Sequence, residues 1–122
     1  MIQLIAFDRR FQVWSYTVSH KQLLLRSTKT ETAATRIDVL FKNVARINLP
    51  TLVDQLVIAA LEREEYPEGL NVGAQTMLER NVYSVCGRDW DGYIVAGTVV
   101  WAEDDHDFHH PSSLLQLPGH TG

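Results

Sequence analysis

The sequence predicts a single, mainly β domain of six to eight strands, folded as an antiparallel sandwich or partly open barrel with room for one short helix. Three segments carry this prediction, namely residues 11–18, 36–49 and 93–102. Side chains of a strand point alternately to opposite faces, so a period of two marks a strand with a face to bury. The length of 122 residues fits one domain over 1–122, in which 103–122 is expected to form a loop and an extended tail.

The clearest alternation lies in residues 36–49. Apolar side chains, including Ile37 and Val39, occupy one parity, while charged side chains such as Arg36 and Asp38 occupy the other. This spacing predicts one buried face and one charged, hydrated face. Asn43 interrupts the apolar parity, which predicts a bulge or a break in the strand at that residue.

Residues 11–20 and 22–27 precede this strand and are expected to pair as a hairpin. Both runs are rich in aromatic, β-branched or leucine residues. The connecting His20-Lys21 lacks the Asn-Gly or Asp-Gly of the favoured two-residue turns, so the sequence does not define the turn type. The polar, threonine-rich segment 27–35 is expected to be an exposed loop.

Two structures compete for the chain after Pro50. Apolar residues recur at helical spacing from 52 to about 65, which gives an α+β fold as the alternative to the mainly β fold. Three glutamates would crowd the C-terminus of that helix, where the macrodipole disfavours anions. We therefore favour a loop at 51–55 and a strand at 56–62, followed by a short helix within 73–80.

A second hairpin is predicted in residues 82–102, with its turn at Asp91-Gly92, because glycine readily adopts a positive φ. The strand 93–102 is apolar on both parities. Such a strand is either central, with layers on both faces, or it meets a second subunit, because monomers seldom expose a stripe of this kind. We expect a homo-oligomer that forms through residues 93–102.

Composition indicates an ordinary globular protein, with 45% hydrophobic and 21% charged residues. Residues 1–50 hold eight basic and three acidic side chains, a net +5, whereas the remainder holds three basic and twelve acidic ones, a net −9. We interpret this asymmetry as ordinary surface charge and expect no nucleic-acid partner. Trp14 and Tyr16, which could offer a stacking surface beside nearby basic residues, are interpreted as core aromatics because they alternate.

No segment predicts secretion or a membrane span, because Asp8 ends the first apolar run well below the length of a signal peptide core. Cys86 is the single cysteine, so no internal disulfide can form. This usage is compatible with a reducing compartment, and we expect a cytoplasmic protein. Cys86 itself is interpreted as a small buried hydrophobe rather than a nucleophile.

The acidic, histidine-bearing segment 103–110 is the local cluster whose chemistry suits a metal. Its ligands of choice would be His106, His109 and His110, with Asp104 as a carboxylate. No known ligand spacing is matched, because His-Glu-x-x-His, Cys-x-x-Cys and the EF-hand loop are all missing from the sequence. We therefore favour a hydrated acidic loop and expect no metal or other cofactor.

Three segments of the N-terminal half, Trp14 to His20, Leu23 to Ser27 and Ile37 to Val44, resemble small bacterial proteins of unknown function. Their order of strand and loop and the Phe-x-x-Val spacing at Phe41 and Val44 are also similar to those of acidic immunity-type proteins of bacterial toxin systems. The resemblance covers about the first sixty residues and implies no activity and no site residue. Two functions follow as hypotheses: a non-catalytic binding or assembly module that acts through a sheet face, and a metal protein or enzyme that uses 103–110.

Overall fold

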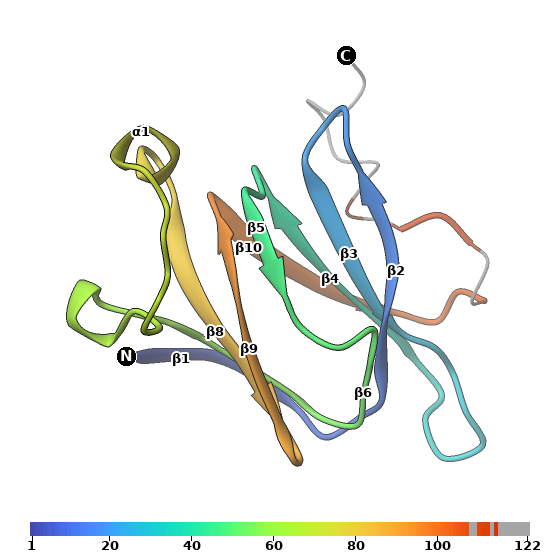
Figure 1. Ribbon diagram of the computed structural model, residues 1–122. Helices are drawn as coiled ribbons and strands as arrows, with labels where there is room; N and C mark the ends of the chain where they lie inside the picture. Colours follow the sequence, from blue (N-terminus) through green and yellow to red (C-terminus); the bar gives the residue numbers. More distant parts are fainter. Residues whose placement is uncertain (108–109, 113, 115–122) are drawn as a thin grey trace.

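The computed structural model describes residues 1–107, 110–112 and 114. It confirms the mainly β prediction: two antiparallel five-stranded sheets face each other and do not close into a barrel (Figure 1). The ten strands exceed the predicted six to eight, because two of the expected long strands are divided between the sheets. In addition, the expected loop 51–55 contains a short strand, Leu52–Val53, which pairs with Phe11 and Gln12. Among the described residues no helix is long and apolar enough to cross a membrane.

Each sheet combines strands from both halves of the chain, and every pairing is antiparallel. Sheet A contains, in spatial order, β1 (Ile2–Phe7), β7 (Leu56–Ala60), β8 (Asn81–Gly87), β9 (Trp90–Ala96) and β5 (Arg46–Asn48). Sheet B contains, in spatial order, β10 (Thr98–Asp104), β4 (Arg36–Lys42), β3 (Gln22–Ser27), β2 (Phe11–Thr17) and β6 (Leu52–Val53).

One corner of the sandwich is a bent two-stranded ribbon. The predicted single strand 36–49 breaks at Asn43, whose φ of 55° ends β4, and the chain continues as β5 in the other sheet. Opposite this break, 93–102 also divides: β9 ends in sheet A and β10 begins in sheet B after Gly97. The N–H of Gly97 donates to the carbonyl oxygen of Lys42 at 2.8 Å, which holds the two bends together.

The second corner joins β1 to β2 and β6 to β7. The alternative of a helix over 52–65 is wrong, because that segment contains the strands β6 and β7, and only a 3-10 turn, Arg63–Glu65, follows. Leu56 and Ile58 are fully buried on β7 while Val57 between them is half-buried, so the burial has the period of a strand. The short helix α1 (Ala74–Met77) lies within its predicted range.

The two predicted hairpins form, but one turn lies elsewhere. β2 and β3 pair through a turn in which Lys21 has a φ of 52°. The turn between β8 and β9 is Arg88-Asp89, with φ 64° at Asp89, rather than Asp91-Gly92. Gly92 instead lies inside β9, where a Cβ atom would come within 2.0 Å of the carbonyl oxygen of Asn48 on β5. Its missing side chain therefore permits the close approach of the neighbouring strand.

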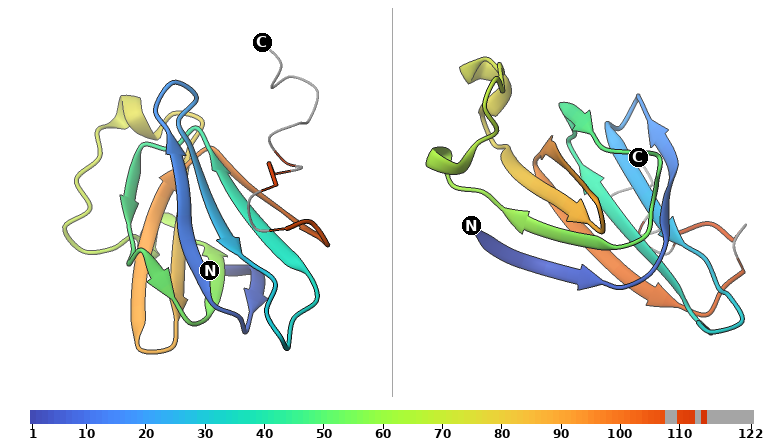
Figure 2. Two further views of the ribbon diagram at one scale, coloured as in Figure 1. Left: turned by 90° about the vertical axis from the view of Figure 1, so that its right-hand side faces the viewer. Right: turned by 60° about the horizontal axis from the view of Figure 1, so that its bottom comes forward.

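The two sheets face each other in Figure 2. The main core is formed by buried side chains from both sheets, and the rings of Phe41 and Tyr83 meet edge to face with their centroids 5.7 Å apart. A smaller cluster lies on the outer face of sheet B, where Leu114 packs on Leu24 and Leu40. The segment that follows β10 thus covers part of this outer face.

Candidate interaction site at the β10 edge

Strand β10 forms one edge of sheet B. It pairs with β4 in an unbroken register that runs from Thr98 opposite Lys42 to Asp104 opposite Arg36. Within the described part of the chain no strand pairs with its other side. A regular seven-residue edge of this kind presents a row of backbone donors and acceptors to any further strand.

The side chains of this edge are apolar at its centre. Residues 98–102 carry no charge, and Trp101 is 44% exposed although it lies on the core-facing side with Val99. Natural edge strands usually carry a lysine, a proline or a bulge that blocks pairing. β10 has none of these devices, so the edge is chemically open to another strand.

Most of the predicted stripe 93–102 is covered by the chain itself. Ile94, Val95 and Ala96 are buried because β9 lies inside sheet A between β8 and β5. The exposed apolar surface of the stripe is concentrated on β10, mainly at Trp101. The structure therefore narrows the expected interaction surface from the whole segment to its second half.

The C-terminal end of β10 is fixed by Arg36, whose side chain is fully buried. Its guanidinium donates two hydrogen bonds to the carboxylate of Asp104, at 2.9 and 3.0 Å. It also donates to the carbonyl oxygens of Asp107, His110 and Pro111. One arginine thus holds the segment after β10 against sheet B.

The pKa of Asp104 reflects this contact. Burial alone would raise the pKa of its carboxyl group, but the hydrogen bonds from Arg36 and from the backbone N–H of His106 favour the charged form. The result is a pKa below the ordinary value of 3.8. Asp104 is therefore an ionised partner of Arg36 at neutral pH.

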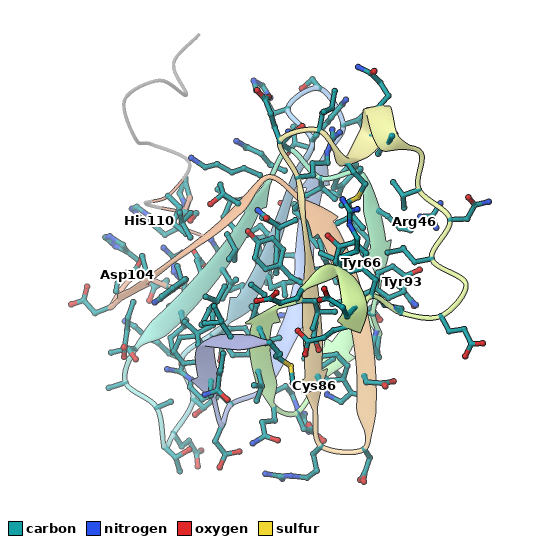
Figure 3. The ribbon with its side chains drawn as sticks, turned by 90° about the vertical axis from the view of Figure 1, so that its left-hand side faces the viewer. Arg46, Tyr66, Cys86, Tyr93, Asp104 and His110 are labelled. Carbon is teal, nitrogen blue, oxygen red and sulfur yellow. The ribbon has the colours of Figure 1, made fainter. Side chains whose placement is uncertain are left out.

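The predicted metal ligands are only partly brought together. Asp104 and His110 lie on the same side of the molecule (Figure 3), and the rings of His106 and His110 stack at 3.9 Å. His109 lies outside the described residues. Where side chains are described, no three of the types histidine, cysteine, aspartate and glutamate converge in an arrangement that could hold a metal ion.

The sequence interpretation missed a buried charge network on β3 and β4. The alternating charges of β4 were expected on a hydrated face, but Arg36 and Asp38 are buried, and Arg26 of β3 is buried beside them. Arg26 donates to both carboxylate oxygens of Asp38 and stacks over the ring of Trp14 at 4.7 Å. The alternation of charged and apolar residues in β4 gave no signal for this burial, because it does not reveal whether another part of the chain covers the charged face.

Cys86 lies on β8 opposite Asp91, and it is half-buried.

Comparisons of the chain with models of protein families, with curated proteins and with solved structures gave no match. The functional argument therefore depends on the geometry of the described residues.

Proposed function

We propose that the protein is a non-catalytic, cytoplasmic binding and assembly module that self-associates by pairing β10 of one copy with β10 of a second copy. The observation that carries the proposal is the regular edge of β10, which is uncharged over residues 98–102 and carries no lysine, proline or bulge. The lone Cys86 supports a reducing compartment. The edge, rather than a sheet face, is the proposed surface, because the segment after β10 covers part of the outer face of sheet B.

Antiparallel pairing of two identical strands generates a two-fold axis, and its register follows from the positions of the charges. If the axis passes through Val100, then Thr98 of each copy lies opposite Ala102 of the other. Val99 lies opposite Trp101, so each exposed indole covers a valine of the neighbouring copy. All five positions 98–102 then pair without placing a charge in the centre.

The flanking charges are complementary in this register. Glu103 of one copy lies opposite position 97 of the other. Gly97 lies beside Asn43, whose carbonyl and side-chain oxygens accept hydrogen bonds from the guanidinium of Arg80. Within the described residues Arg80 contacts only neutral oxygens, and Glu103 accepts from the hydroxyl group of Thr35. Each charge therefore gains an opposite partner in the dimer.

A charge-swap series tests this register. Glu103→Arg and Arg80→Glu should each weaken self-association, because each places like charges face to face, and the double variant should restore it. The dimer dissociation constant from sedimentation equilibrium is the readout. A double variant as weak as the single variants would reject the proposed pairing.

The alternative of a metal protein or enzyme at 103–110 has less support. The carboxylate of Asp104 already neutralises Arg36, so binding a cation there would leave this buried guanidinium with only Asp38, a carboxylate that it shares with Arg26. No described contact favours this alternative over the assembly module.

A further inference from the structure

A polar pocket of about 720 Å³ lies at the corner between β1 and β2, at the lower end of the molecule in Figure 1. The corner residues 8–12 form one wall, and the β3–β4 loop contributes Ser27, Thr28, Thr30 and Thr32. Asp54 and Arg88 complete the rim from the β6–β7 connection and the β8–β9 turn. Four distant parts of the chain thus build one site, and no residue of β10 lines it.

The lining of this pocket carries an excess of positive charge, with four arginines against two aspartates. Arg26 is neutralised by the buried Asp38 outside the pocket. The ion pairs Arg10 with Asp54 and Arg88 with Asp8 lie on the rim, and all four of their side chains are more than half exposed. Exposed pairs of this kind are weak and are screened by salt, so breaking them costs little free energy.

Among the described lining residues, Arg9 provides the one positive charge that remains after Arg10, Arg26 and Arg88 are paired with aspartates. Its guanidinium donates to the hydroxyl groups of Ser27 and Thr35 and to the carbonyl oxygens of Thr28 and Thr35. Across the described part of the chain, no carboxylate lies within ion-pair distance of it. These four hydrogen bonds fix a partly buried cation beside a cluster of threonine hydroxyl groups, which is a preorganised environment for an anion.

We propose that this pocket binds a phosphate-bearing small molecule. Arg9 supplies the fixed charge, while Arg10 and Arg88 release their exposed aspartates and bind phosphate oxygens with their planar guanidinium groups. The hydroxyl groups of Thr30 and Thr32 add neutral donors. The volume exceeds that of a single phosphate ion and falls in the range of pockets for metabolite-sized ligands, so the ligand is a phosphorylated compound of about nucleotide size.

Isothermal titration calorimetry with inorganic phosphate, pyrophosphate and adenosine diphosphate tests the proposal. We expect the larger probes to bind more tightly than phosphate. The double variant Arg10→Ala and Arg88→Ala should raise their dissociation constants about tenfold or more, because two charged donors are lost. The matched control is Arg46→Ala with Arg63→Ala, which removes two exposed arginines outside the pocket and should leave binding unchanged.

Two further single substitutions should have the opposite effect and increase the affinity of the pocket for pyrophosphate. Asp8→Asn and Asp54→Asn remove the carboxylates that compete for the rim arginines, so each should tighten binding of pyrophosphate. The proposal is overturned if no probe binds at millimolar concentration, or if the pocket and control variants bind equally. Tighter binding of a phosphorylated peptide than of any small probe would also overturn the assignment. Binding should persist in the edge variant Trp101→Lys, so this site and the assembly proposal succeed or fail separately.

Discussion

Replacing Asp38 by alanine should destabilise the fold strongly, because its carboxylate neutralises a buried arginine. The side chains of Arg26 and Asp38 are 2% and 1% exposed, and the guanidinium Nε lies 2.7 Å from Oδ1. Arg36 is also buried, 3.8 Å from the same carboxylate, but it retains Asp104 as a counter-ion. The substitution therefore leaves one buried charge, that of Arg26, without its carboxylate.

Removing one partner of a buried ion pair typically costs about 3–5 kcal/mol, because the remaining charge stays desolvated. Whole domains are stable by only about 5–15 kcal/mol, so the loss is a large share of the total. We expect the free energy of unfolding, measured by urea denaturation with circular dichroism, to fall by this amount in Asp38→Ala.

Two further variants isolate the cause. Asp54→Ala breaks the exposed ion pair with Arg10 and should cost less than about 1 kcal/mol. The double variant Arg26→Met with Asp38→Leu removes both charges and should recover most of the stability that Asp38→Ala loses. A loss below about 1 kcal/mol in Asp38→Ala, equal to that of the exposed pair, would refute the reasoning that buried charge sets the cost.

Three other predictions concern backbone packing, pH and metals. Gly92→Ala should cost about 1–3 kcal/mol in chemical denaturation, because its Cβ would overlap a carbonyl group of β5, whereas Gly73→Ala, with open space around it, should be close to neutral. The lowered pKa of Asp104 stabilises the folded state above the ordinary pKa of 3.8, and this stability is lost as the pH falls through the folded-state value. Denaturation between pH 5 and pH 2 should therefore show a smaller loss of stability in Asp104→Asn than in the wild type, and an equal loss would contradict the assignment. Zinc, nickel or manganese should leave the melting temperature unchanged, because Arg36 already occupies the carboxylate of the 103–110 segment; stoichiometric metal in the purified protein would prove this wrong.

Local alternation was sufficient to predict most of the strands and one of the two breaks, but not β6, which lies in the expected loop 51–55. Asn43 interrupts the apolar parity and tolerates a positive φ, so the sequence marked the place where β4 ends. The matching break at Gly97 was only partly visible, because the apolar run continues on both sides of it. That the chain changes sheets at both places depends on pairing between distant segments, which no local pattern encodes.

The β8–β9 turn and the buried charges of β4 show two further limits of prediction from local sequence. Asp91-Gly92 has the composition of a favoured turn, but the close approach of β5 requires the glycine inside the strand, and Asp89 supplies the positive φ instead. The charges of β4 alternate as a solvated face would, yet the covering segment after β10 buries them.

The two proposed sites could be predicted from the sequence to different degrees. The composition of residues 93–102 predicts an interaction surface there, and the exposed apolar part of this segment lies on β10. The arginine pocket was not predicted, because Arg9 and Arg88 are far apart in the chain and line one pocket only when the β1–β2 corner and the β8–β9 turn have come together.

The mass of the protein in solution tests the central claim most directly. In sedimentation equilibrium at micromolar concentration, the wild type should have twice the 13.9 kDa mass of one chain. Trp101→Lys, which places a charge in the paired edge, should return the mass to that of one chain. Val18→Lys, at an exposed apolar residue between β2 and β3, should remain dimeric, because β4 and β3 separate β2 from β10 in sheet B. A wild-type mass of 13.9 kDa, or a Trp101→Lys variant that stays dimeric, would contradict assembly through β10.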